Sequence, residues 1–433
     1  MHAATHTATP TPRARGRVAR SVGLAPGVAL PDRPGIDGVR ALAAAAVVVA
    51  DAGAGWETGG SVGIEMLFVV TGFLVTSLLL RERREHGRVD LLRFWGRRAR
   101  RALPALLTVL GGVSVFVLAQ RPEDLSRLGP AVRAVLAGLS NWHFVLQAGP
   151  RAPEQVAPSL LQHLWSLSVG AQFVLWWPLI VVPLLARAGR ARLRAAACTL
   201  ALASGLAMGV LSLSAPPLRV VYGTDTRAAG LLIGAALALS YPPAAWERRA
   251  RGAPSRRLRL LGLVVAAALA ATLVAVPHSG AALRGGLFLA ALLTALLLAA
   301  TLRSPDLDRL LGAPPLRWLG LRSYGLFLWH WPVLLALGGP VAAARPEISA
   351  LYVVLTIVLA DLTYRFIEVP LSDLRLVRES GRVGRPMLAV RATALACGAA
   401  TVAALLTGQA QAPAAGAPPA GRPPVPQAQP SGR

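Results

Sequence analysis

The 433-residue chain is strongly apolar and strongly basic. Hydrophobic residues make up 54% of it and charged residues only 15%, with a mean hydropathy of +0.54. A water-soluble chain of this length needs more polar surface to cover its core, so the composition indicates a membrane protein. The net charge of +25 comes from arginines in short clusters between apolar runs. Such clusters orient membrane helices, and we therefore expect no nucleic-acid partner.

The two ends of the chain differ from its apolar middle. Residues 1–34 are rich in Arg, Pro and Thr and lack the apolar core of a cleavable signal peptide, so we expect a disordered cytoplasmic leader. The Pro/Ala-rich composition of residues 409–433 predicts a disordered extracytoplasmic tail. Cys198 and Cys397 lie in apolar runs and offer no spacing for a disulfide framework or a metal site.

The first two apolar stretches, residues 36–56 and 62–80, are joined by a short polar turn. Arg40 and Asp51 lie inside the first stretch. An ionisable residue in a spanning helix is costly and is therefore a candidate functional residue. Eleven positions correspond to about three helical turns, so both side chains share one face, roughly 16 Å apart along the axis.

The apolar runs predict an all-α polytopic membrane protein. About 20 apolar residues are needed to cross a bilayer. The stretch 131–148 is less apolar and is expected to be interfacial or re-entrant. The eleven predicted spans are residues 36–56, 62–80, 102–119, 163–185, 195–213, 228–243, 259–277, 283–302, 323–339, 349–370 and 388–408.

Loop charge predicts the orientation of these spans. Residues 81–101 contain nine arginines, whereas residues 214–226 contain only Arg219. Arginine-rich loops face the cytoplasm, so we expect the N-terminus inside, the C-terminus outside and the plasma membrane as the location. The other arginine-rich loops are residues 186–194, 243–259, 303–322 and 371–391.

Seven short sequence motifs lie in or near these spans. In chain order they read IDGVRALA (36–43), GIEMLFVVTGF (63–73), FWGRRARRALPAL (94–106), LWSLSVGAQF (164–173), YGTDTRAAGLLIGA (222–235), SYGLFLWHWPV (323–333) and YRFIEVPL (364–371). Together they resemble the acyltransferase-3 family of integral membrane acyltransferases, which includes O-acetylases of bacterial surface glycans. The resemblance implies a ten-helix acyltransferase domain over residues 35–371. A cytoplasmic linker, 372–387, and an additional span, 388–408, would follow.

The chain departs from the family pattern at its chemistry-bearing positions. The family has a histidine, thought to be catalytic, where this chain has Asp51. The family's two adjacent glutamates are replaced by Gly170 and Ala171, and no acid follows Arg227. Asp51 is a candidate general base for an acceptor hydroxyl, and His330 is a candidate for the base that position 51 lacks. A structural role is open for each.

The resemblance implies acyl-CoA as a cytoplasmic donor substrate, with no permanently bound cofactor. Arginine can bind a phosphate through two parallel hydrogen bonds, and topology control is the alternative role for these residues. Asp361, Arg365 and Glu368 are spaced to share a helix face and are expected to form an internally paired cluster. The candidate CoA-binding residues are Arg40, Arg97, Arg98 and Arg101. The residues expected to bind substrate or to be structural are Trp165, Gln172, Arg227, Tyr324 and Glu368.

The function indicated by the motifs is a membrane O-acyltransferase. It would move an acyl group, acetyl in the simplest case, from acyl-CoA to a hydroxyl of a surface glycan or a lipid-linked sugar. One alternative is a catalytically degenerate family member that acts as a scaffold or partner subunit. Another is a transporter of glycan intermediates, which the lack of a long internal repeat makes less favourable.

Overall fold

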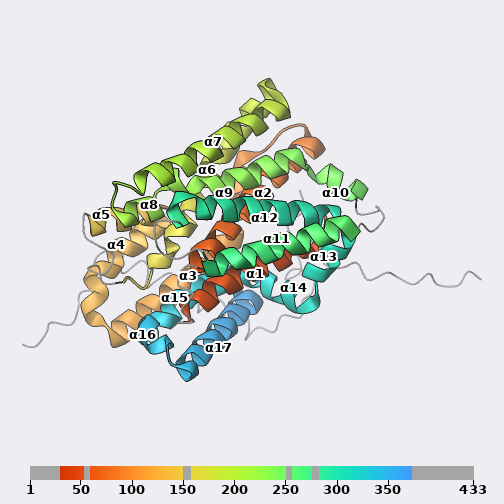
Figure 1. Cartoon of the computed structure of the whole chain (residues 1–433). Coiled ribbons are helices and arrows are strands. Elements are labelled where there is room, and N and C mark those ends of the chain that lie inside the picture. Colours follow the sequence, from red (N-terminus) through yellow and green to blue (C-terminus); the bar gives the residue numbers. More distant parts are fainter. Residues whose placement is uncertain (1–29, 53–58, 150–157, 250–255, 276–281, 373–433) are drawn as a thin grey trace, which may run out of the picture.

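The computed structural model describes residues 30–52, 59–149, 158–249, 256–275 and 282–372, and these residues form helices and connections without a strand (Figure 1). The predicted all-α polytopic membrane fold is confirmed. Seven helical stretches are long and apolar enough to cross a membrane. They include α2 (Gly59–His86), α3 (Leu91–Gln120), α6 (Trp165–Arg187), α7 (Gly189–Leu211), α11 (Arg256–Ala275), α12 (Leu287–Arg303) and α17 (Pro346–Thr363).

Three more predicted spans correspond to helices that are shorter or carry more charge. These are α1 (Pro34–Asp51), α9 (Thr224–Ser240) and α15 (Ser323–Ala336). The predicted span 388–408 lies outside the described residues. The stretch 131–148 falls on α4 (Leu125–Leu136) and α5 (Ser140–Ala148), with Gly138 between them at a φ of 69°. Neither of these two helices reaches spanning length.

Short helices connect and cap the long ones. Several begin with proline, whose fixed φ suits the first helical position. They are η1 (Pro122–Asp124), η3 (Gln162–Leu164), α8 (Pro217–Tyr222), α10 (Pro243–Arg249), η4 (Ala282–Gly286), α13 (Pro305–Leu311), α14 (Pro314–Leu321), α16 (Gly339–Ala343), η5 (Tyr364–Glu368) and α18 (Val369–Ser372).

Helix α2 lies at the centre of the bundle and packs against α1 and α9. Glycine allows the closest of these contacts. A Cβ added at Gly72 would lie 1.9 Å from the Leu231 carbonyl oxygen, and one at Gly234 would lie 2.0 Å from the Val69 carbonyl oxygen. The backbones of α2 and α9 therefore touch, as small residues permit in membrane helix pairs.

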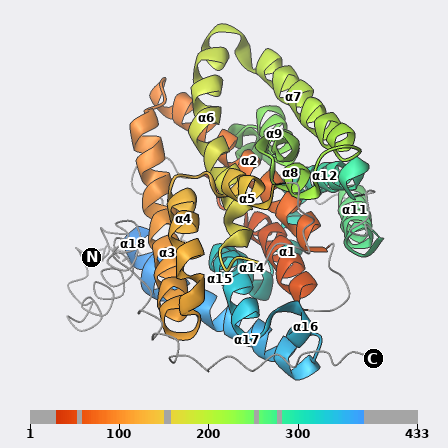
Figure 2. The same cartoon turned by 90° about the vertical axis from the view of Figure 1, so that its left-hand side faces the viewer.

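A second group consists of α1, α15 and α17, in which α15 packs against both of the others. In Figure 2, α3 and α4 lie on one side of the bundle and α11 and α12 on the other. Helix α15 thus connects α17 to α1, and α1 in turn contacts α2. This arrangement brings together polar residues that are far apart in the sequence.

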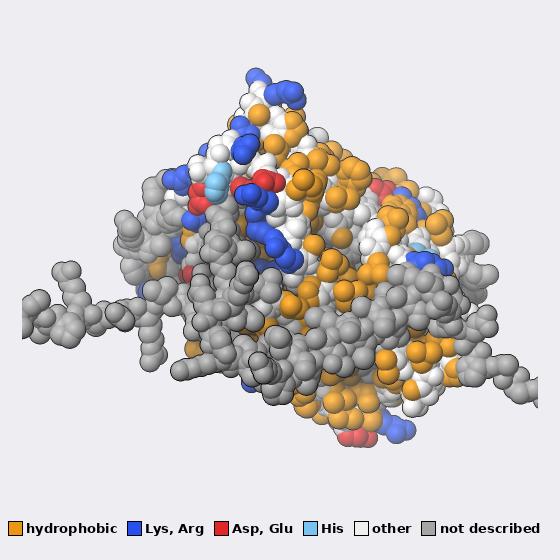
Figure 3. Space-filling model, turned by 180° about the vertical axis from the view of Figure 1, so that it is seen from behind, with side chains coloured by type: hydrophobic (Ala, Val, Ile, Leu, Met, Phe, Trp, Pro, Cys, Tyr) orange, Lys and Arg blue, Asp and Glu red, His pale blue; other side chains and the backbone are white. Residues whose placement is uncertain are grey.

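The outer surface is rich in exposed hydrophobic side chains. Leu206 and Val210 on α7 are 60% and 65% exposed, and Val264 on α11 is 64% exposed. Figure 3 shows a broad hydrophobic area on one face, with patches of arginine beside it. A surface of this kind suits contact with lipid rather than water.

Candidate active site

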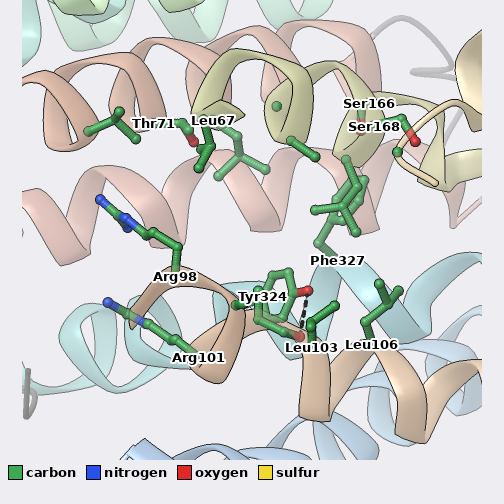
Figure 4. Close-up of a pocket in the computed structure, with 18 of the residues that line it drawn as sticks. Leu67, Thr71, Arg98, Arg101, Leu103, Leu106, Ser166, Ser168, Tyr324 and Phe327 are labelled. Carbon is green, nitrogen blue, oxygen red and sulfur yellow. Dashed lines mark hydrogen bonds between the residues drawn. The ribbon is translucent and has the colours of Figure 1, made fainter. Parts of the chain in front are cut away.

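A pocket of about 640 Å³ lies among α2, α3, α6 and α15. Aliphatic side chains form most of its wall, with a small number of polar side chains among them. Figure 4 shows Arg98 and Arg101 at one end and Ser166 and Ser168 at the other. The pocket has the size and the mainly apolar lining that are typical of small-molecule sites.

The cationic end of the pocket contains Arg40 from α1 together with Arg98 and Arg101 from α3. Arg40 donates a hydrogen bond of 2.8 Å to the Ser323 hydroxyl and lies 3.4 Å from the Asp37 carboxylate. The Nη2 of Arg98 is buried and has no partner among the described residues. Three guanidinium groups therefore lie at the same end of the pocket, and among the described residues they keep hydrogen-bond donors that could bind a ligand.

Arg97 does not share this position. Its guanidinium group lies 2.5 Å from the Glu82 carboxylate of α2, which also accepts a hydrogen bond from the Asp90 backbone N–H. The structure thus brings three of the four predicted CoA-binding arginines to the pocket. The fourth is held by an acid on a neighbouring helix.

Glu368 also lies at the cationic end, which corrects the predicted three-residue cluster. Asp361 pairs with Arg365 at 2.8 Å and with Arg322 at 2.5 Å, but Glu368 lines the pocket, and its buried Oε1 lacks a partner among the described residues. Residues 364–368 form a π-helical turn, η5. A π-turn inserts an extra residue into the helical repeat, so Glu368 leaves the face that simple α-helical spacing predicts.

The two candidate bases lie next to each other. His330 Nε2 lies 3.4 Å from Asp51 Oδ2, while His330 Nδ1 lies 2.6 Å from the Phe327 carbonyl oxygen. Because that carbonyl can only accept, Nδ1 carries the hydrogen and Nε2 presents its lone pair to Asp51. The sequence offered the two residues as alternatives, whereas the structure makes them a pair that can share one proton.

His163 is a third polar residue and lies next to His330. Its ring centroid lies 5.1 Å from that of His330, and its Nε2 is hydrogen-bonded to the Leu328 carbonyl oxygen at 3.1 Å. Pro332 frees this carbonyl, because proline has no N–H to donate four residues back. The freed carbonyl binds His163, whereas His330 uses the Phe327 carbonyl.

Phe327 separates the pocket from the two imidazoles. Its ring lines the pocket and lies 5.2 Å from the His330 ring and 5.7 Å from the His163 ring, centroid to centroid. Figure 4 shows Phe327 on the side of the pocket that carries the two serines. The end of the pocket that carries the two serines therefore adjoins the pair formed by Asp51 and His330.

Arg227 and Trp165 belong to a buried cluster beside the pocket. The Arg227 guanidinium group lies between the Phe68 and Trp165 rings, 5.7 and 5.3 Å from their centroids, and 3.4 Å from the Glu65 carboxylate. Trp165 also stacks on Tyr222 at 4.8 Å. The acid that the sequence lacks after Arg227 is thus supplied by α2, and no local spacing signals that partnership.

Gln172 joins helices instead of facing the pocket. Its amide donates to the Gly138 carbonyl at 2.8 Å and to Asn141 Oδ1 at 3.0 Å, and it accepts from the Thr224 hydroxyl at 2.6 Å. Through these three hydrogen bonds, Gln172 on α6 links its own helix to α5 and α9. Tyr324 does line the pocket, with its hydroxyl donating to the Ala102 carbonyl at 3.1 Å.

The pocket wall is neutral where the resembled motif has its two glutamates. Gly170 and Ala171 both line the pocket, and a Cβ added at Gly170 would meet nothing within 4 Å. Within the described part of the chain, no group of three or more His, Cys, Asp or Glu residues could hold a metal ion. The polar groups in or next to the pocket include the arginine cluster, Glu368, the two serines and, beyond Phe327, the paired Asp51 and His330.

The family of this chain follows from comparison with known proteins. The family model described as an acyltransferase domain matches residues 33–365, and the chain belongs to this family. The motif-based resemblance is thereby confirmed.

Similar proteins include cell-wall acetyltransferases. YrhL of Bacillus subtilis, provisionally assigned as a peptidoglycan O-acetyltransferase, is 36% identical over 348 residues, which cover 78% of this chain and 54% of YrhL. The peptidoglycan O-acetyltransferase OatA of Listeria monocytogenes is 33% identical, with 78% and 55% covered. The O-acetyltransferase OatA of Staphylococcus aureus is 32% identical, with 78% and 57% covered. The chain spans about half the length of these relatives. No solved structure matches it.

Proposed function

We propose that this chain is a membrane O-acyltransferase that takes an acetyl group from acetyl-CoA and passes it to a hydroxyl of a surface glycan of the peptidoglycan type. The acyltransferase family supports the reaction class, and the names of the relatives support the acetyl group and the acceptor. The observation that carries the proposal is one pocket with an arginine cluster at one end and, beyond Phe327 at the other, the Asp51–His330 pair.

The arginine cluster suits the phosphates of the donor. Arg40, Arg98 and Arg101 can make charge-assisted, two-pronged hydrogen bonds to phosphate oxygens. The apolar wall behind them suits the pantetheine arm and the acyl group. With arginine-rich loops facing the cytoplasm, this end of the pocket opens to the compartment that holds acetyl-CoA.

The Asp51–His330 pair suits the proton transfer of the reaction. The acceptor oxygen attacks the thioester carbonyl carbon, so a C–O bond forms and the C–S bond breaks. The pair takes the hydroxyl proton, and CoA leaves as a thiolate that is protonated in water. The 3.4 Å separation and the bare Nε2 allow either side chain to receive the proton and the other to stabilise it.

The test uses the full chain reconstituted in liposomes with radiolabelled acetyl-CoA and soluble peptidoglycan fragments. We expect alkali-labile label on the fragments and stoichiometric release of CoA thiol. Failure of the chain to bind acetyl-CoA would overturn the proposal.

A scaffold role is the second candidate, because Asp51 replaces the family's histidine and Gly170 and Ala171 replace its two acids. Acetyl-CoA binding without turnover, under conditions where a relative with the histidine is active, would identify that role.

A further inference from the structure

The buried face of α17 carries two hydroxyl groups without a partner. Tyr352 and Thr356 are both fully buried, and neither hydroxyl has a hydrogen-bond partner among the described residues. A spacing of four places them on the same face of α17, one turn apart. Buried hydroxyls are nearly always hydrogen-bonded, so an unpartnered one calls for an explanation.

Other hydroxyls in this bundle show what the usual solution is. Ser114, Thr294 and Thr301 each donate at 2.7 Å to the carbonyl four residues earlier in their own helices. Thr356 could use the Tyr352 carbonyl in the same way. A phenol has no such option, because its hydroxyl lies too far from its own backbone. Tyr352 therefore needs a partner from another helix or from solvent.

Tyr352 lies beside the Asp51–His330 pair. It belongs to a packed cluster with Val48 on α1 and Ala52 just after that helix, which lie on either side of Asp51 in the chain. The cluster also includes Val333, one turn beyond His330 on α15. The carboxylate of Asp51 is close enough to the phenol of Tyr352 for the two groups to interact electrostatically.

Asp51 can accept another hydrogen bond. One of its oxygens, Oδ2, faces His330 Nε2, and its side chain is 23% exposed, so solvent reaches the carboxylate. An ordered water needs two or more polar partners, and a phenol and a carboxylate supply them. The phenol that lacks an acceptor and the carboxylate that can accept another hydrogen bond thus border the same packed cluster.

We propose that Tyr352 is a positioning residue of the transfer site, whose hydroxyl donates a hydrogen bond to Asp51, directly or through one water, and holds that carboxylate against His330. This inference rests on the proposed acyl transfer. Its chemical consequence is that Asp51 keeps one orientation while the acceptor proton moves, which a general base requires.

The experiment is a double-mutant cycle on acetyl transfer by the full chain in liposomes. Tyr352→Phe removes only the hydroxyl and should lower kcat by roughly tenfold or more, with the KM for acetyl-CoA unchanged. Thr356→Val is the matched control, because it removes the other unpartnered hydroxyl of the same helix face, and its kcat should stay near wild type. The double variant Asp51→Asn/Tyr352→Phe should be no slower than Asp51→Asn alone. Additive effects, or equal losses in Thr356→Val and Tyr352→Phe, would overturn the inference.

A spectroscopic readout separates this inference from the proposed function. In protein labelled with ¹³C at the aspartate carboxyl groups, the infrared band missing from Asp51→Asn identifies Asp51. That band should move in Tyr352→Phe and stay in place in Thr356→Val. If wild type transfers no acetyl group but the band moves, the proposed function fails and the contact stands. If wild type is active and the Asp51 band has the same position in Tyr352→Phe as in wild type, the proposed contact is overturned.

Discussion

The carboxylate of Asp51, at the end of α1, faces the imidazole of His330 in α15 at 3.4 Å. Because His330 Nδ1 is committed to the Phe327 carbonyl, Asp51 meets the one ring nitrogen that remains free to accept a proton. Two residues that the sequence offered as alternative bases are thus neighbours in the structure.

Removing either member of the pair should stop proton transfer. A general base contributes about 10²–10⁴-fold, so Asp51→Asn and His330→Gln should each lower kcat by about 100-fold or more. The double variant should lose little beyond the worse single variant, because both act in one step. Initial rates of CoA release with saturating acetyl-CoA measure this. A fully active Asp51→Asn would exclude Asp51 as the base.

Restoring the family residue tests the altered position directly. In Asp51→His, an imidazole takes the place of the carboxylate opposite His330. If the rest of the pocket is intact, turnover should rise above wild type, since imidazole exchanges protons near neutral pH without tuning. If turnover does not rise, Asp51→His should be combined with Gly170→Glu and Ala171→Glu, which restore the two acids on the pocket wall.

Donor affinity should distinguish Arg40 from Arg97. Arg40→Ala should weaken acetyl-CoA binding by about 1.5–3 kcal/mol, the range for hydrogen bonds to charged groups. Arg40→Lys should restore only part of this, because the two-pronged geometry is lost. Arg97→Ala, whose side chain pairs with Glu82 away from the pocket, should leave the affinity unchanged. Isothermal titration on correctly inserted protein measures all three, and equal losses at both positions would contradict the arrangement.

The α2–α9 contact should not tolerate a larger residue. A Cβ at Gly72 would lie 1.9 Å from the Leu231 carbonyl oxygen, so Gly72→Ala must push the two helices apart. Overpacking of this kind costs about 1–3 kcal/mol. Gly209→Ala on α7 is the matched control, because a Cβ there meets nothing within 4 Å. Thermal unfolding in detergent should show a loss for the first variant and none for the second.

An exposed ion pair before the predicted span 228–243 gives a pH dependence of known sign. Burial raises the pKa of Asp225, but the hydrogen bonds and charge of Arg219, at 2.8 Å, outweigh it, so the pKa lies below its usual 3.8. The resulting stabilisation is present above the unfolded value and is lost as pH falls through the lowered one. For a pair this exposed we expect about 0.2–1 kcal/mol. Arg219→Ala should therefore lower the unfolding temperature slightly at pH 6, and by progressively less as the pH falls below 3.8.

The orientation of the chain can be read by reporter fusions. The arginine distribution predicts that fusions after residues 90, 140, 250 and 425 report inside, outside, inside and outside in that order. A phosphatase and a fluorescent reporter at each point give opposite signals. A cytoplasmic signal after residue 425 would contradict the count of eleven spans.

The sequence predicted the helices better than the contacts between them. Seven predicted spans recur as helices of spanning length, because a long apolar run is a local property. The contacts of Asp51 with His330 and of Arg227 with Glu65 join distant segments, and hydropathy says nothing about them. The face of Glu368 was mispredicted because the π-turn at residues 364–368 is invisible to an α-helical repeat.

The arginine cluster at the cationic end of the pocket would have a consequence for regulation if it binds the donor as proposed. Arg40, Arg98 and Arg101 would hold the phosphates of the donor, far from the thioester that reacts. Free CoA carries the same phosphates, so the protein would retain its spent product nearly as well as its substrate, a case of uniform binding. Turnover would then follow the ratio of acetyl-CoA to CoA in the cytoplasm more than the level of either. Acetyl transfer would then slow whenever free CoA accumulates relative to acetyl-CoA.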